Sequence, residues 1–267
     1  MKKNILYLYF VLHCLTLFSQ QKEVWRDTIV SDLKLNNSIR LNYTVDVFKN
    51  DSPRHLTDLS YGLKTKKCSY ILHYQKANRF NKNDDALEIE SYPKLIKKLY
   101  AYVGGGFSLH KTLLPNYRFG SELFYNYSKG LESSLGMRYL EFNNSNVLIY
   151  TASFGKYYRN DFYTIRTYVT PKTKGTSMTV QTMARRYFRD KYHFASLVAA
   201  YGRGFTETGL EDYNTLTSLR FGAEFQHVLT ENFYVSAQAD WRRDELAYSI
   251  GDFENRMVLS TGLKLIF

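Results

Sequence analysis

Apolar and polar residues alternate along much of the chain. In NSIRLNYTVDVF (37–48), every second residue from Ile39 onward is apolar, and the residues between them are polar or charged. The same alternation returns in the segments 117–127, 218–228 and 233–243. Because successive side chains of a β-strand point to opposite faces of the sheet, this period of two predicts strands with one apolar and one hydrophilic face.

Turn-forming residues divide the alternating pattern into about fourteen segments. Many of them reach ten residues or more, close to the ~9–11 that a tilted strand needs to cross a bilayer and longer than the usual ~5–6 of soluble sheets. We therefore predict an all-β fold, a transmembrane antiparallel up-and-down β-barrel of about 14 strands, with 12 as the alternative because the first four segments are the least regular. The predicted strands are 37–48, 56–64, 68–77, 86–92, 99–109, 117–127, 131–142, 147–158, 162–171, 177–188, 193–203, 214–228, 233–243 and 255–267.

The connections between the predicted strands differ in length on the two sides of the barrel. Most connections on one side have three or four residues, although the segment 91–98 is longer than a turn on that side should be. The two longest connections, 204–214 and 244–254, fall on the other side. Short periplasmic turns, long outer loops and an even strand number are typical of bacterial outer-membrane barrels.

A soluble β-sandwich or barrel with its apolar face inward is the alternative, and alternation by itself does not exclude it. Strand length and an export signal favour the membrane barrel. Aromatic residues near the segment ends also favour it, such as Tyr125 with Tyr127 and Tyr157 with Tyr158, because rings at that level suit the interfacial girdles of a membrane barrel.

The N-terminus has the layout of a secretory signal. Two lysines precede an apolar run that ends at Phe18, and Ser19 and Gln20 follow. A membrane anchor is the alternative, but the run is shorter than the ~20 residues of a spanning helix and contains a histidine. We predict a cleaved signal peptide over 1–20, a short periplasmic segment over 21–36 and the barrel over 37–267.

Composition narrows the function classes. The full chain has a net charge of +11, and without residues 1–20 it keeps 34 basic and 25 acidic side chains, a net charge of +9. The basic residues are spread among acids, so we expect no nucleic-acid partner and favour contact with anionic lipid headgroups or acidic glycans. After cleavage Cys68 is the only cysteine, so an internal disulfide, a cysteine-based metal site and a redox pair are excluded.

The chain ends on STGLKLIF, with an aromatic last residue. The order of polar, glycine, apolar and aromatic positions is similar to the terminal insertion signal of outer-membrane barrels. The four positions that carry this layout are Ser260, Gly262, Leu265 and Phe267. We therefore expect the barrel assembly machinery to be a partner during biogenesis.

Several longer stretches resemble the YaiO family of outer-membrane β-barrels. They are YVGGGFS (102–108), LLPNYRFGSELFYNYSKGLESSLGMRYLEF (113–142), VLIYTASFGKYYRNDFYTIRTYVTP (147–171), ARRYF (184–188) and YGRG (201–204). The resemblance implies a barrel fold and the outer membrane of a Gram-negative bacterium. It implies no activity and no catalytic residues.

Catalytic and metal-binding constellations are weak in this sequence. The glycines at 104–106 lack the Lys-Ser/Thr pair of a phosphate loop and are better explained by a bend, a bulge or bulky side chains crossing them. The best enzymatic candidate is His55, expected in an outer loop with Asp51, Ser52 and Asp58 nearby. We predict no catalytic residue, no cofactor and no metal.

Charged residues of both signs fall on the predicted inner face. They could form an ion-pair network that fills the lumen, or a polar lining for a narrow conduit. Barrels of ~8 strands are filled and those of ~16 are open, so we expect a constricted lumen. The predicted charges are Arg118, Glu122, Glu132, Arg138, Arg166, Arg185, Arg220, Glu224, Asp240 and Arg242.

These observations favour a monomeric structural or transport component of the envelope, a narrow channel for glycans or small polar solutes. The expected surroundings are outer-membrane lipids including lipopolysaccharide. An outer-leaflet lipid-modifying enzyme that uses the loops 49–55 or 244–254 is one alternative, and a surface binding or adhesion platform built on these loops is another.

Overall fold

A computed structural model describes residues 37–49, 51–143, 145–171, 176–188, 190–203, 215–246 and 251–267. The predicted signal peptide, the segment 21–36, the predicted loop 204–214 and residues 247–250 lie outside the described residues. No helix in the described ranges is long and apolar enough to cross a membrane.

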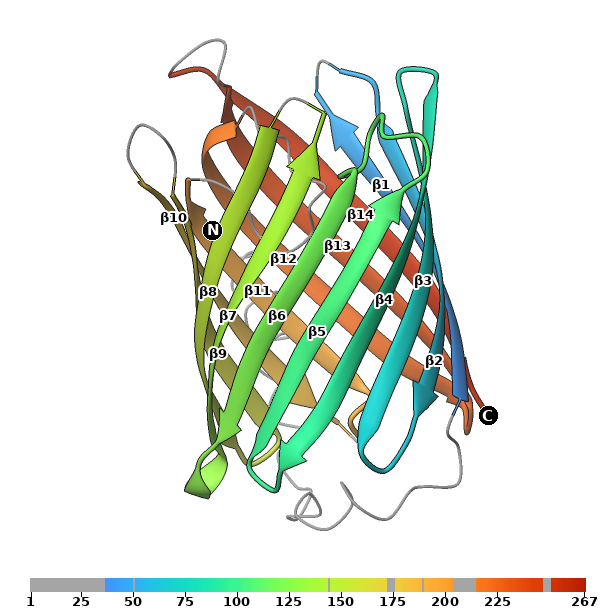
Figure 1. The fold of residues 1–267 in the computed structure, drawn as a ribbon, viewed down its shortest axis with the longest axis vertical. Helices are drawn as coiled ribbons and strands as arrows, with labels where there is room; N and C mark the ends of the chain where they lie inside the picture. The colour runs from blue at the N-terminus through green and yellow to red at the C-terminus, as the bar shows by residue number, and fades with distance from the viewer. Residues whose placement is uncertain are drawn as a thin grey trace, which may run out of the picture. The chain divides into compact units, whose positions relative to one another are not determined.

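The described chain forms a closed barrel in which every strand pairs with its neighbours in the sequence (Figure 1). All pairs are antiparallel, and β1 pairs with β14. The prediction of an up-and-down barrel is confirmed, with 14 strands rather than 12. The strands are β1 (Asn37–Phe48), β2 (Arg54–Lys64), β3 (Cys68–Arg79), β4 (Lys82–Ile96), β5 (Leu99–Ser108), β6 (Tyr117–Asn126), β7 (Leu131–Phe142), β8 (Ser145–Tyr158), β9 (Asp161–Pro171), β10 (Thr176–Tyr187), β11 (Phe194–Gly202), β12 (Thr215–Thr230), β13 (Phe233–Leu246) and β14 (Phe253–Ile266).

Two predicted connections are shorter in the structure. The segment 91–98 belongs mostly to β4, which continues to Ile96, so only residues 97–98 form the turn. A register shift between Lys94 and Ile96 interrupts the alternation there and leaves both Leu95 and Ile96 exposed. The end of this strand therefore cannot be recognised from alternation in the sequence. The predicted loop 244–254 is also too long, because β13 reaches Leu246 and β14 begins at Phe253.

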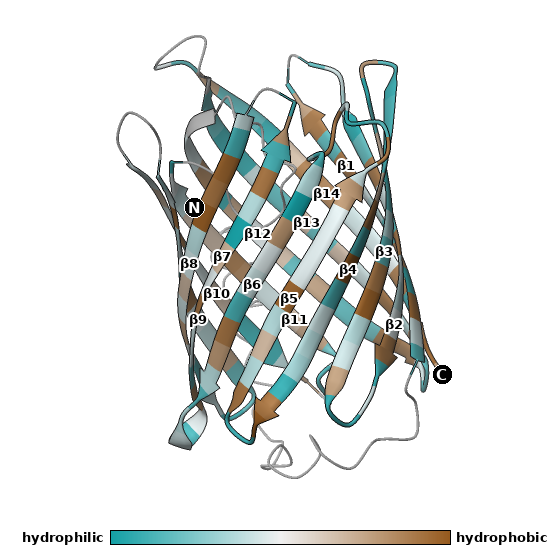
Figure 2. Ribbon diagram, viewed as in Figure 1, coloured by the Kyte–Doolittle hydropathy of each residue, from teal (hydrophilic) through white to brown (hydrophobic). Residues whose placement is uncertain are grey.

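Apolar side chains lie on the outside of the barrel and polar ones inside. Leu41 and many other large apolar residues are exposed, Leu41 by 44%, whereas Asp46 on the opposite face of β1 is only 3% exposed. Hydrophilic and hydrophobic residues are interspersed along each strand (Figure 2). A soluble β-sandwich or barrel with its apolar face inward is therefore excluded, because its apolar side chains would be buried.

The two ends of the barrel differ. The end that carries the C-terminus has short connections, including the 3₁₀ turn η1 (Ser128–Gly130), and we call it the turn end (Figure 1). At this end, the backbone N–H groups of Asn37 and Phe267 each donate to the other's carbonyl oxygen at 2.9 Å. The final residue thus completes the seam that closes the barrel. We call the opposite end the loop end.

Candidate functional site

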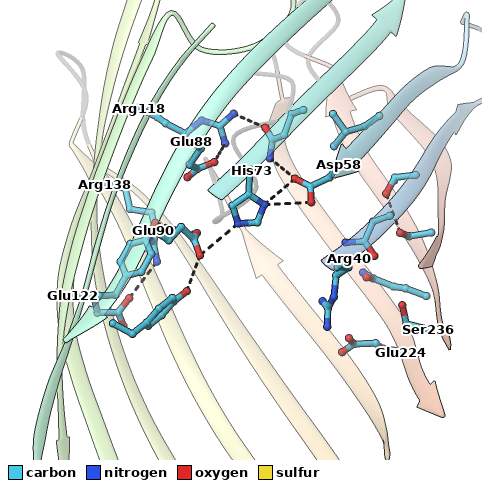
Figure 3. Close-up of a pocket in the computed structure, with 18 of the residues that line it drawn as sticks. Arg40, Asp58, His73, Glu88, Glu90, Arg118, Glu122, Arg138, Glu224 and Ser236 are labelled. Atoms are coloured by element: carbon cyan, nitrogen blue, oxygen red, sulfur yellow. Dashed lines mark hydrogen bonds and ion pairs between the residues drawn. The ribbon is translucent and has the colours of Figure 1, made fainter. Parts of the chain in front are cut away.

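A polar cavity of about 560 Å³ lies in the barrel lumen. Its lining comes from β1–β7 and β9 on one side and from β12–β14 on the other, and most of the lining residues are polar or charged. Figure 3 shows Arg118, His73 and Glu90 on one wall, and Arg40, Glu224 and Ser236 on the other. The alternation of each strand supplies these side chains, because every second residue points inward.

His73 links two carboxylates across three neighbouring strands. Its Nδ1 lies 3.0 Å from Asp58 Oδ2 on β2, and its Nε2 lies 3.8 Å from Glu90 Oε2 on β4. The amide nitrogen of Gln75 donates to the same Asp58 oxygen at 3.2 Å, and the hydroxyl of Tyr92 donates to Glu90 at 2.9 Å. These five side chains form a continuous polar patch on one wall of the cavity.

Glycines leave room for the charged side chains of β6 and β7. Gly106 lies between Arg118 and Glu88 in the register of β4, β5 and β6, and Arg118 crosses it to donate to Glu88 at 2.8 Å. A Cβ at Gly120 would lie 2.9 Å from a guanidinium nitrogen of Arg138. The glycines thus mark places where long lumen side chains cross a neighbouring strand.

Glu122 is a second centre of the charge network. Arg138 donates to its carboxylate at 3.3 Å and Arg166 at 3.0 Å, and the hydroxyl of Ser134 donates at 2.5 Å. The side chain of Glu122 is almost fully buried. One carboxylate therefore holds two arginines from β7 and β9.

The remaining predicted charges lie mainly on the far wall. Arg185 donates to Glu224 at 2.9 Å, and Arg220 donates to Asp240 at 2.9 Å. Arg242 is buried and lies opposite Arg220 in the register. Glu132, nearer the turn end, accepts a hydrogen bond from the hydroxyl of Tyr100 at 3.0 Å.

Oppositely charged residues four apart on one strand do not pair with each other in β6 or in β12. Arg118 contacts Glu88 rather than Glu122, and Arg220 contacts Asp240 rather than Glu224. Residues four apart on a strand are separated by roughly 13 Å, whereas neighbours on adjacent strands are roughly 5 Å apart. The pairs therefore depend on the register between strands. The role of these charges in solute passage stays a prediction.

An acidic patch on the early strands lies outside the predicted set of inner-face charges. Asp58, His73, Glu88 and Glu90 are absent from the predicted inner face, although each occupies an alternating position in its segment. Arg40 lies on the polar face that the alternation predicts for its strand, but it is not among the predicted inner-face charges. The alternation within 56–64, 68–77 and 86–92 was the signal that would have found the patch.

The loop between β5 and β6 (109–116) turns inward at the loop end. Leu114 packs against Ala77 and Ala86, which lie on the lumen faces of β3 and β4. The buried carboxylate of Asp84 accepts hydrogen bonds from the Ser108 hydroxyl and from four backbone N–H groups between His110 and Leu114. This loop narrows the lumen, because it covers part of the inner wall.

The residues of the enzymatic candidate around His55 do not form a catalytic site. His55 lies in β2 rather than in an outer loop, and its Nδ1 lies 2.6 Å from the hydroxyl of Tyr43 on the outer face. Asp58 points into the lumen, on the opposite face of the same strand, because the two residues are three apart. Within the described ranges, no group of three or more His, Cys, Asp and Glu residues is placed to hold a metal ion.

A closed barrel with an apolar exterior and a polar, charged lumen defines an integral barrel of the outer-membrane class. The chain belongs to the YaiO family: the YaiO membrane beta barrel domain matches residues 36–204. The resemblance noted in the sequence is thereby confirmed.

Three solved structures share the fold at low sequence identity. A bacterial polysaccharide outer membrane secretin is 8% identical, with a TM-score of 0.56 over 88% of this chain and 100% of that chain. The CymD monoaromatic hydrocarbon channel is 8% identical, with a TM-score of 0.56 over 87% and 89%. The outer membrane protein Omp33 of Acinetobacter baumannii is 10% identical, with a TM-score of 0.53 over 87% and 98%. No curated protein sequence matches the chain. The protein is thus an outer-membrane β-barrel that resembles channels in fold.

Proposed function

We propose that the barrel is a narrow channel that admits small polar solutes, including glycans. The observation that carries this proposal is the cavity of about 560 Å³ in the lumen, lined by charges of both signs and by hydroxyl and amide groups. A lumen filled completely by ion pairs would leave no such space. Its polar wall provides hydrogen-bonding partners for a hydroxylated solute, which an apolar wall would not.

The channel we propose is constricted for two reasons. A barrel of 14 strands lies between the filled ~8-stranded barrels and the open ~16-stranded porins. The inward loop 109–116 also covers part of the lumen wall at the loop end. We propose that the turn end faces the periplasm, as the short turns of outer-membrane barrels do. In this proposal the chain is exported with a cleaved signal peptide, inserts through the barrel assembly machinery and functions as a monomer among outer-membrane lipids.

Single-channel recording in planar bilayers tests the proposal. The folded full chain should give small conductance steps. Gln238→Trp places a large ring in the cavity and should reduce the step size by about half or more. Ala239→Trp, on the lipid-facing side of the same strand, is the matched control and should leave the steps unchanged.

Swelling of proteoliposomes gives a second measurement with uncharged solutes. Arabinose should enter vesicles that contain the wild-type chain faster than the tetrasaccharide stachyose does, and Gln238→Trp should slow arabinose. If demonstrably folded protein gives neither conductance nor swelling, the channel proposal is wrong and a structural role for the barrel remains.

A further inference from the structure

Cationic side chains from separate parts of the barrel converge at the turn end of the lumen. Lys64 lies on the inner face of β2 and Lys264 on the inner face of β14, while Lys191 comes from the connection between β10 and β11. We call these three residues the turn-end lysine cluster. Arg40 on β1 lies directly opposite Lys264 in the register.

Tyr192 brings part of this cluster together. Its backbone carbonyl accepts a hydrogen bond from the side chain of Gln226 at 2.8 Å, and its ring centroid lies 5.1 Å from that of Tyr234. Both partners are inner-face residues, so the connection between β10 and β11 folds into the lumen. The ammonium groups of Lys191 and Lys264 lie 4.9 and 4.8 Å from the centroid of the same Tyr192 ring.

The lysines of the cluster interact with one another and with further cations. Lys64 interacts electrostatically with Lys191 and Lys94, and Lys264 interacts with Arg40 and Lys191. No carboxylate in the described ranges lies within ion-pair distance of the cluster's three ammonium groups. Two acids lie near the cluster and have other partners: Asp190 accepts a hydrogen bond from the backbone N–H of Tyr192 at 2.7 Å, and Glu224 is held by Arg185 at 2.9 Å. Like charges that face one another without a counter-charge repel, and an anion between them removes that repulsion.

We propose that the turn-end lysine cluster binds a soluble acidic glycan, whose carboxylate groups the ammonium groups contact. This inference rests on the proposed channel function and names its substrate class. The cations face the lumen, so the headgroups of surrounding lipids, which contact the outer face, do not reach them. Three ammonium groups on three elements suit several anionic groups along one oligomer better than a single small anion. The half-buried ring of Tyr192, which packs on Tyr234, adds a flat apolar surface beside the charges, which suits a sugar ring.

Isothermal titration calorimetry on the folded full chain in a zwitterionic detergent tests the inference. Tetragalacturonate is the probe, and uncharged maltotetraose is the ligand control. Tetragalacturonate should bind, its affinity should fall steeply as salt is raised, and maltotetraose should bind at least about tenfold more weakly. Equal binding of the two sugars, or no binding of tetragalacturonate, would overturn the inference.

Matched variants locate the binding site. Lys64→Gln, Lys191→Gln and Lys264→Gln combined should weaken tetragalacturonate by about tenfold or more. Lys66→Gln, Lys67→Gln and Lys97→Gln combined remove the same charge from exposed turns at the same end and should change affinity by less than about twofold. The triple Lys→Arg variant of the cluster should retain binding, which separates loss of charge from loss of folding. Equal effects of the two Gln triples would overturn the inference.

The two proposals fail in different ways. Binding in micelles does not require conduction, so a chain that binds tetragalacturonate without conducting contradicts the channel alone. A chain that conducts in potassium chloride without binding tetragalacturonate contradicts the acidic-glycan site alone.

Discussion

The two ends of the lumen both carry basic side chains but compensate them differently. At the loop end, Asp46 accepts from Arg54 at 2.6 Å and from Arg256 at 3.1 Å, and Arg256 also forms an ion pair with Asp244, with Nε 2.7 Å from Oδ2. Arg256 is only 4% exposed. At the turn end, the lysine cluster is half-buried or exposed, and no acid in the described ranges pairs with it.

The difference indicates separate roles for the two ends. A charge that is removed from water is stable only when an opposite charge and hydrogen bonds compensate it, so the loop-end arginines act as cross-links between strands. The turn-end lysines retain contact with water and do not need a protein partner to stay charged. Charges that stabilise the barrel and charges that contact a solute can thus be separated by substitution.

The largest effect is expected at Asp46. Asp46→Asn should lower the free energy of unfolding by about 3–5 kcal/mol, because Arg54 and Arg256 would then face a neutral amide in a buried site. Urea unfolding in lipid vesicles, followed by tryptophan fluorescence, measures the change. The control is Asp51→Asn at the same end, where the acid is 41% exposed and pairs with Arg79 at 2.9 Å. That change should cost less than about 1 kcal/mol. Similar losses from both variants would contradict the distinction between buried and exposed pairs.

A smaller effect is expected at Asp84, which anchors the inward loop 109–116. Asp84→Ala should cost about 2–4 kcal/mol, because the Ser108 hydroxyl and four backbone N–H groups lose a charged acceptor. The loop should also become sensitive to trypsin at Lys111. Asp85→Asn, on the outer face of the same strand, should leave the loop resistant. A loop that stays protected without Asp84 would show that its apolar packing suffices.

Much of the fold was predictable because each strand carries its own signal. Alternation within β1 or β7 identifies the strand, its apolar face and its bounds without reference to any other part of the chain. The errors arise where that local signal is interrupted, as at the bulge in β4, or where it continues through charged residues, as at the end of β13.

The site was less predictable because its contacts depend on register. Alternation places Arg118 on the inner face, but its contact with Glu88 requires the stagger of three strands and the absence of a side chain at Gly106. The inward fold of the β10–β11 connection, which brings Tyr192 beside Lys264, leaves no periodic signal at all.

The backbone seam between Asn37 and Phe267, rather than the lysines, stabilises the turn end. Deletion of Phe267 should cost about 1–2 kcal/mol, because it removes the two reciprocal backbone hydrogen bonds with Asn37 at the seam. Phe267→Ala keeps both hydrogen bonds and should cost less in the same urea experiment. The fraction of each variant assembled in the outer membrane tests the predicted insertion signal separately. If Phe267→Ala assembles as well as wild type, the aromatic ring is not part of that signal.

The smallest effect on stability is expected at Lys64. Lys64→Gln should change the free energy of unfolding by no more than about 0.5 kcal/mol, and the change should be toward greater stability, because it removes repulsion from Lys191 and breaks no ion pair. The same urea unfolding measures it, with Lys66→Gln in the adjacent exposed turn as the control. A loss of more than about 1 kcal/mol would mean that Lys64 stabilises the barrel much as Arg54 does. The turn-end lysines would then stabilise the barrel as the loop-end arginines do, and the distinction between the two ends of the lumen would not hold.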